Sequence, residues 1–173
     1  MPETADPPPT IFLGPREIVI AAAPVRVKTV LGSCVAISMH ARRLGWTAIT
    51  HCFLPRAGAP LRSLQRAEAL TYVDTAIELM WREAARRGAS LEDLEVKLFG
   101  GAESVILNGS HPFQVGSMNV EAAEQSLAAL GLSLAARSTG GRGGMLIELE
   151  CGTGQVLVRN LSSARTGAIQ ETS

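Results

Sequence analysis

The chain has 173 residues, of which 46% are hydrophobic and 18% are charged, so its size and composition suit one globular domain. Its 16 Lys and Arg residues balance 16 Asp and Glu residues, which argues against a nucleic-acid binder or a polybasic membrane-surface protein. No apolar run approaches the roughly 20 residues of a membrane span, so we expect no membrane insertion. The 3 cysteines are too few for a disulfide scaffold and indicate a cytoplasmic protein with reduced thiols.

The first third of the chain predicts a short tail followed by strands. Met1–Pro9 is acidic and rich in proline, which is typical of a disordered tail and unlike a signal peptide. Short apolar or alternating runs separated by breaks then predict strands at Glu17–Ala21, Val25–Val30, Cys34–Met39 and Trp46–Phe53. In the second of these runs, Val27 and Thr29 share one face while Arg26 and Lys28 lie on the other.

The clearest helix is predicted over Leu64–Arg87, where apolar residues recur at three- and four-residue steps. The pairs Glu78–Arg82 and Glu83–Arg87 have the spacing of ion pairs on the solvent-facing side of a helix. Gly88 follows at the position of a left-handed C-terminal cap, which predicts where this helix ends.

The rest of the chain predicts a second helix among further strands. That helix is predicted over Val120–Leu130, with Asn119 as its N-cap and Gly131 as its terminator. Strand-like runs occupy Val96–Phe99, Leu132–Ala136, Met145–Cys151 and Gln155–Leu161. Strands with inserted helices predict a single α+β domain, which we place at residues 13–162 between tails at 1–12 and 163–173.

The segment from Thr29 to Cys34 is the strongest candidate for chemistry. Cys34 follows Gly32-Ser33 where one apolar run ends and the next begins, so a tight turn there would expose its sulfur and the neighbouring N–H groups. A thiol has a reference pKa of about 8.5 and needs help to become a nucleophile at neutral pH. His51, on a later strand, could take the thiol proton, and we then expect Cys34 to react well below its reference pKa.

These residues also have ordinary structural explanations. A single cysteine is most often a small buried hydrophobic residue, and spacing alone does not place Cys34 beside His51. We assign Cys52 and Cys151 to packing, because both lie within apolar runs. A zinc site is weakly supported, since the adjacent His51 and Cys52 have no second pair at metal-ligand spacing.

Two other groups of residues receive simple interpretations. His40 and His111 flank polar stretches, so we expect both to be solvated. The glycines at 140–144 lack the Lys of a phosphate-binding loop and a following helix pattern, so they predict a turn between strands.

Several separated sequence blocks occur in an order that points to a known family. The most specific are Leu31-Gly-Ser-Cys-Val-Ala36 and Lys97-Leu-Phe-Gly-Gly-Ala102. The others are His51-x-x-Leu54-Pro55, Tyr72-Val-Asp-x-Ala76, Val115-Gly-x-x-Asn119, Gly140-Gly141 and Thr153-Gly154-x-Val156. Together they span about Gly14 to Leu161 and resemble the CheD chemoreceptor glutamine deamidases of bacterial and archaeal chemotaxis.

The resemblance implies a fold and a set of site residues. The fold would have layered mixed β-sheets with helices packed outside, similar to the catalytic domain of cytotoxic necrotizing factor toxins. The triad would consist of Cys34 as nucleophile, His51 as base and Thr29 as the residue that orients the imidazole. Four further residues would line the oxyanion and substrate site: Gly32, Ser33, Phe99 and Gly100.

The resemblance also implies a reaction and partners. The protein would be a protein-glutamine glutaminase that converts glutamine side chains of methyl-accepting chemotaxis receptors to glutamate through a Cys thioester. No metal and no organic cofactor would be required. The partners would be the cytoplasmic helical domain of the receptor and a CheC-type phosphatase, and we expect a monomer. Met118 and Gly144 stand where relatives commonly have basic residues, which affects the expected partner preference.

Two other functions fit the same resemblance. A CheD-like surface could serve as a weakly catalytic or non-catalytic adaptor that binds receptors or a CheC-type phosphatase. A protein-directed transglutaminase would share the thioester and differ in the nucleophile that resolves it. Intact Thr29, Cys34 and His51 favour an enzyme, because an adaptor has no physical need for them.

Overall fold

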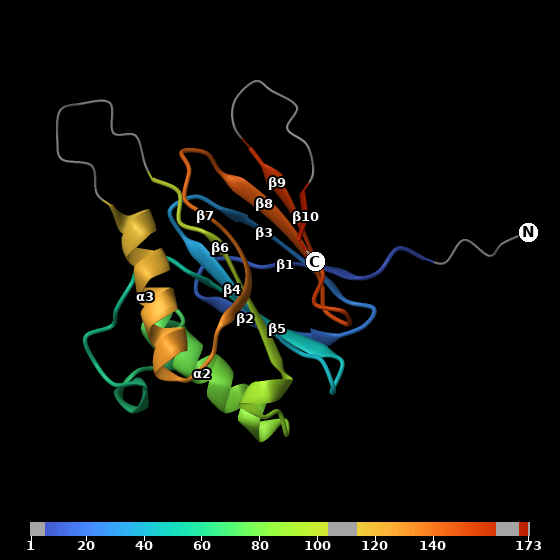
Figure 1. The fold of residues 1–173 in the computed structure, drawn as a ribbon, viewed down its shortest axis with the longest axis horizontal. Helices are drawn as coiled ribbons and strands as arrows, with labels where there is room; N and C mark the ends of the chain where they lie inside the picture. Colours follow the sequence, from blue (N-terminus) through green and yellow to red (C-terminus); the bar gives the residue numbers. More distant parts are fainter. Residues whose placement is uncertain (1–5, 104–113, 162–169, 173) are drawn as a thin grey trace, which may run out of the picture.

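In the computed structural model, residues 6–103, 114–161 and 170–172 are described. They form two five-stranded sheets and a small set of helices (Figure 1). The strands are β1 (Thr10–Phe12), β2 (Glu17–Ala22), β3 (Arg26–Leu31), β4 (Val35–Ala41), β5 (Trp46–Cys52), β6 (Leu94–Gly100), β7 (Leu134–Thr139), β8 (Met145–Glu150), β9 (Val156–Asn160) and β10 (Gln170–Thr172). The helices are α1 (Arg66–Ala69), α2 (Val73–Arg86) and α3 (Val115–Ala129), with 3-10 turns at Leu61–Ser63 and Leu91–Asp93.

The elements stack in three layers. The central sheet has the strand order β2-β5-β4-β6-β7, and the outer sheet has the order β1-β3-β8-β9-β10. Helices α2 and α3 cover one face of the central sheet, and the outer sheet covers the other (Figure 1). This arrangement confirms the α+β fold of layered mixed sheets with helices packed outside. Within the described residues, the helices are too short or too polar to cross a lipid bilayer.

Strand β4 lies at the middle of the central sheet and shows how the two cores are built. Its side chains alternate, as they must in a strand, so successive residues enter different cores. Ile37 and Met39 join the core beneath the helices, whereas Ala36 joins the core between the sheets. All seven β4 residues are buried, because both faces of this strand are covered.

Each strand-like run predicted from the sequence overlaps an observed strand. The strands β1 and β10 are additional, and both lie in segments that we expected to be tails. β1 pairs in parallel with β3, and β10 pairs antiparallel with β9, so both extend the outer sheet. A strand of three residues is too short to show the alternation of apolar and polar residues that identifies a strand. Its pairing with the outer sheet depends on residues that are distant along the chain.

The long predicted helix is interrupted. The structure has α1 and α2 where we expected one helix over Leu64–Arg87, and the chain between them is extended at Tyr72. The break pairs with the segment that follows β5: the Phe53 and Leu54 N–H groups donate to Thr71 O, and the Val73 N–H donates to Leu54 O. This tertiary pairing outweighs the local helix pattern. Gly88 has a φ of 82° just after α2, which confirms the predicted end of the helix.

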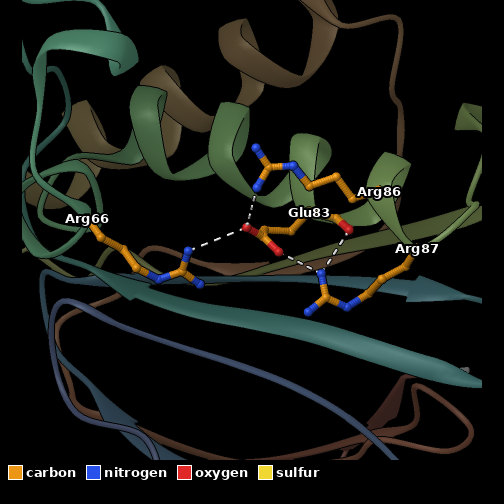
Figure 2. A network of polar contacts seen from close by, with 4 residues as sticks. All are labelled: Arg66, Glu83, Arg86 and Arg87. Carbon is orange, nitrogen blue, oxygen red and sulfur yellow. Dashed lines mark hydrogen bonds and ion pairs between the residues drawn. The ribbon is translucent and has the colours of Figure 1, made fainter.

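Glu83 on α2 holds a network of arginines (Figure 2). The two predicted pairs, Arg82 with Glu78 and Arg87 with Glu83, are both present. The Glu83 carboxylate also pairs with Arg66 of α1 at 3.4 Å and with Arg86 at 3.3 Å. Arg87, followed by Arg66, lowers the pKa of Glu83. Glu83 is buried rather than on the solvent side, so its role is to tie α1 to α2.

Helix α3 begins at Val115, earlier than the sequence pattern predicted. Asn119 is therefore not its N-cap but a fully buried residue in its second turn. The Asn119 side chain donates hydrogen bonds to the carbonyl oxygens of Ser33 and Phe53, so it does not cap the N–H groups at the start of α3. Gly131 has a φ of 76° directly after the end of this helix, so its predicted role as terminator is confirmed.

Candidate active site

Cys34 lies in the tight turn between β3 and β4. Gly32 is exposed in this turn, and Ser33 and Cys34 are half-buried. Two backbone hydrogen bonds fix the turn to the end of β6: Gly101 N–H donates to Cys34 O at 2.8 Å, and Ala102 N–H donates to Gly32 O at 2.9 Å. The turn therefore has a defined backbone path, and Cys34 as a residue is partly exposed in it.

Gly100 and Gly101 lie directly against this turn. Gly100 has a φ of 96°, and a Cβ there would collide with the carbonyl oxygen of Cys34. The space beside Gly100 is therefore occupied by the turn that carries Cys34, whereas a Cβ at Gly101 would collide with Val120 and Gly116 of α3. Phe99 is fully buried in the core between the sheets, so its side chain is not available to a substrate in this structure.

His51 and Thr29 meet between the two sheets. His51 is on β5 of the central sheet, Thr29 is on β3 of the outer sheet, and both are buried. The distance from His51 Nδ1 to Thr29 Oγ1 is 2.8 Å. The Thr29 hydroxyl also donates to Leu13 O at 2.7 Å. A hydroxyl has one proton, so Thr29 accepts the hydrogen bond from His51 and holds the proton of the ring on Nδ1.

This tautomer leaves Nε2 of His51 with a free lone pair. Nε2 is buried and has no hydrogen-bond partner among the described residues. Ala36 is directly opposite His51 in the β4–β5 pair, and Cys34 is two residues before Ala36, in the turn that leads into β4. The Cys34 side chain packs against the core between the sheets, where His51 also points. The structure thus brings Cys34, His51 and Thr29 to one end of the layer between the sheets.

The sequence of this chain matches one family along most of its length. The family described as CheD chemotactic sensory transduction matches residues 53–160. A relative from Pyrococcus horikoshii, named probable chemoreceptor glutamine deamidase CheD, is 38% identical over 135 residues, which cover 78% of this chain and 82% of the relative. The chain belongs to the CheD family.

Two further CheD relatives show a similar degree of identity to this chain. A relative from Rhodospirillum rubrum is 37% identical over 91% of this chain and 86% of its own length. One from Geobacter sulfurreducens is 38% identical over 89% of this chain and 91% of its own length. Both are named probable chemoreceptor glutamine deamidases of the CheD type, so the family resemblance in the sequence blocks is confirmed.

Burial favours the neutral forms of both Cys34 and His51 in this CheD protein. Burial raises the pKa of the Cys34 thiol, and the thiol's own backbone N–H opposes that change in part. Burial lowers the pKa of His51, against the smaller opposite effects of the Leu13 carbonyl and the charge of Glu17. The expectation of a Cys34 pKa well below its reference value is therefore wrong. The neutral form of His51 is the protonation state that a general base requires.

The other two cysteines are packing residues, as the sequence predicted. Cys52 and Cys151 are fully buried. Burial raises the pKa of Cys52 to about 12 and that of Cys151 to about 11, so neither forms a thiolate at neutral pH. Cys52 follows His51 on β5 and so points to the opposite core, beneath the helices.

His40 is buried, so the prediction that it is solvated is wrong. It lies on the inter-sheet face of β4, where its Nδ1 is 3.0 Å from the Thr47 hydroxyl. That hydroxyl donates to Cys151 O at 2.7 Å. The two-sided burial of β4 is a property of the assembled sheets that the sequence around His40 does not reveal. His111 lies outside the described residues.

The positions of two residues at the site were not predicted from the sequence. Glu17 on β2 is directly opposite His51 in the β2–β5 pair, and no motif includes it. Asn119 was visible in the Gly-x-x-Asn block, but its reach to the Cys34 turn depends on how α3 packs. Among the described residues, no group of three or more His, Cys, Asp or Glu side chains is arranged to hold a metal ion.

We predict that Thr29→Val lowers kcat partially. Valine keeps the β-branched shape, but it cannot accept the proton of Nδ1, so the tautomer and orientation of His51 are no longer fixed. Steady-state ammonia release at neutral pH measures the effect. Thr47→Val removes the matching hydroxyl beside His40 and is the control, for which kcat should stay at the wild-type value. An equal loss of kcat in Thr29→Val and Thr47→Val would show that both hydroxyls affect activity only by stabilising the fold.

The pH profile of kcat/KM gives a second prediction. His51 must be neutral to take the proton, and its lowered pKa means that activity rises with pH along an acidic limb centred below 6.5. Glu17→Gln removes a charge that raises the pKa of His51, so the limb should move to still lower pH. Glu92→Gln, an exposed carboxylate in the 3-10 turn at Leu91–Asp93, is the control and should leave the limb in place. A limb that moves upward in Glu17→Gln would contradict the assignment.

Proposed function

We propose that this chain is a protein-glutamine glutaminase that deamidates glutamine side chains of chemoreceptors. Its relatives carry the name probable chemoreceptor glutamine deamidase. One observation carries the proposal for this chain. Thr29 holds the His51 proton on Nδ1, which leaves a buried Nε2, without a partner in the described part of the chain, on the side of the layer where Cys34 packs. An activated nucleophile of this kind is the signature of cysteine hydrolases.

The reaction follows from these groups. The sulfur of Cys34 attacks the side-chain amide carbon of the glutamine while His51 Nε2 takes the thiol proton. The oxygen of the tetrahedral intermediate is stabilised by the backbone N–H of Cys34, a contribution of about 3 kcal/mol for one donor. His51 then gives its proton to the amide nitrogen, and ammonia leaves as the thioester forms. His51 next takes a proton from water as the water oxygen attacks the thioester. It then gives that proton to the departing Cys34 sulfur, so the glutamate side chain is released and the Cys34 thiol is restored.

The substrate in this proposal is the cytoplasmic helical domain of a chemoreceptor. A glutamine that projects from a helix can reach a partly exposed sulfur without unwinding of the helix. Free glutamine lacks the other contacts of the receptor, so it should be a very poor substrate, because remote contacts position the amide. The proposal also includes a CheC-type phosphatase as a second partner and a monomeric protein, both of which rest on the family resemblance. Met118 is exposed on α3. Because relatives commonly have a basic residue at this position, the methionine would change the contacts that this surface makes with a partner.

The decisive experiment compares three substrates under the same conditions. These are free glutamine, a short glutamine-containing peptide and a folded receptor cytoplasmic fragment. Ammonia release is followed in solution, and intact-mass analysis counts the sites at which NH₂ is replaced by OH. We expect release from the fragment alone at a useful rate. Equal efficiency on all three substrates would indicate a small-molecule amidase, and tight receptor binding without release would indicate an adaptor.

A further inference from the structure

Asn119 connects helix α3 to the nucleophile turn. Its side chain is fully buried, and its Nδ2 group donates to Ser33 O at 3.0 Å and to Phe53 O at 3.2 Å. Ser33 immediately precedes the nucleophile, and Phe53 follows Cys52 at the end of the strand that carries His51. One amide therefore joins the turn that carries Cys34 to the end of the strand that carries His51.

The bond to Ser33 O determines where the next N–H points. The carbonyl of Ser33 and the N–H of Cys34 belong to one planar trans peptide, so they point in opposite directions. Because Asn119 holds the carbonyl toward α3, the Cys34 N–H faces away from α3. The same N–H acts on the Cys34 thiol, where it opposes the effect of burial on the pKa. The donor and the attacking sulfur thus face the same space.

The peptide on the other side of Cys34 is held in a similar way. Gly101 N–H donates to Cys34 O at 2.8 Å. Gly116 lets α3 approach this region, because a Cβ there would collide with the carbonyls of Gly101 and Ala102. The carbonyls on both sides of the Cys34 α-carbon, those of Ser33 and Cys34, are therefore held by hydrogen bonds. The bond to Ser33 O comes from the Asn119 side chain, and the bond to Cys34 O comes from the Gly101 backbone.

The hydrogen-bond pattern of Asn119 is poor for a residue that serves stability alone. Its Oδ1 is buried without a partner among the described residues, which is unfavourable for folding. An apolar side chain at this position of α3 would avoid that loss, but it would remove the hydrogen bonds that Ser33 O and Phe53 O accept from α3. The amide is the side-chain group that holds the Ser33 carbonyl, and it thereby sets the plane of the peptide that carries the Cys34 N–H.

We propose that Asn119 is a positioning residue that aims the Cys34 N–H at the oxyanion of the deamidation reaction. The proposal rests on the function proposed above and deepens it. Asn119 touches neither the sulfur nor the substrate, so it acts through the peptide that it orients. Loss of Asn119 should therefore slow the steps that create an oxyanion and leave substrate binding unchanged.

The test compares Asn119→Ala with the wild type and with Leu127→Ala on the receptor fragment. Leu127 is fully buried two turns further along α3, so its truncation destabilises the same helix away from the turn. We expect Asn119→Ala to lower kcat by about 10²- to 10³-fold with little change in KM, as for loss of one oxyanion donor. Leu127→Ala should lower the melting temperature and keep kcat.

Alkylation of Cys34 by iodoacetamide separates positioning from collapse of the turn. Displacement of iodide by the sulfur forms no oxyanion, so on the high-pH plateau, where the thiol is ionised, Asn119→Ala should alkylate within a few-fold of the wild-type rate. A parallel fall of alkylation and kcat, or an unchanged kcat, would overturn the proposal. If Asn119→Ala does not fold, Asn119→Ser is measured in the same way. A wild type that releases no ammonia from any substrate overturns the proposed function itself, whereas an active wild type with an unaffected variant overturns only the role of Asn119.

Discussion

Cys34→Ala is expected to abolish ammonia release from a receptor fragment, with kcat/KM lower by about 10⁴-fold or more. The sulfur forms the covalent intermediate, and no other thiol can replace it, because burial suppresses the thiolate forms of Cys52 and Cys151. Cys34 is half-buried at the edge of the core, so its loss should change the melting temperature only slightly. Ammonia release and thermal unfolding of the same preparation measure both effects.

Cys52→Ala and Cys151→Ala are the matched controls. Both side chains are fully buried, so each variant should unfold at a lower temperature while the activity per folded molecule is retained. Activity of Cys34→Ala within about tenfold of the wild type, which equals about 1.4 kcal/mol of transition-state stabilisation, would contradict the assignment of the nucleophile. The comparison thus separates a catalytic cysteine from a structural one within the same chain.

The sequence was most informative where a pattern repeats along the chain. Alternation in the second strand-like run placed Thr29 on the same face as Val27. In the structure that face is buried, and Thr29 meets His51 there. Residues that take their conformation from a distant partner were less visible. The extended Tyr72 interrupts a helical pattern because it pairs with Leu54, which is far from it along the chain.

The electrostatics of the site could not be derived from the sequence for the same reason. A cysteine beside a histidine suggests a lowered thiol pKa, but burial between two sheets raises the pKa of Cys34 and lowers that of His51. Burial is a property of the assembled layers rather than of the residues near Cys34. The same holds for His40, whose local sequence resembles a loop although it lies in the central strand.

His51→Ala is expected to cost nearly as much activity as the loss of Cys34. The two residues act as a unit, because a neutral thiol cannot attack the amide without a base and the leaving nitrogen needs a proton. Iodoacetamide gives an independent measurement on the free enzyme. Without His51, the alkylation of Cys34 should shift to higher pH, since no imidazole takes the proton.

His40→Ala is the control for this variant, because His40 repeats the local arrangement of His51 on the neighbouring strand. It too is buried between the sheets with Nδ1 on a threonine hydroxyl that donates to a backbone carbonyl. Removal of His40 should lower the melting temperature but leave kcat and the alkylation profile unchanged. If both histidine variants lose activity and stability to the same extent, the loss in His51→Ala comes from the packing between the sheets. If His51→Ala alone loses activity and shifts the alkylation profile, His51 is the base for Cys34.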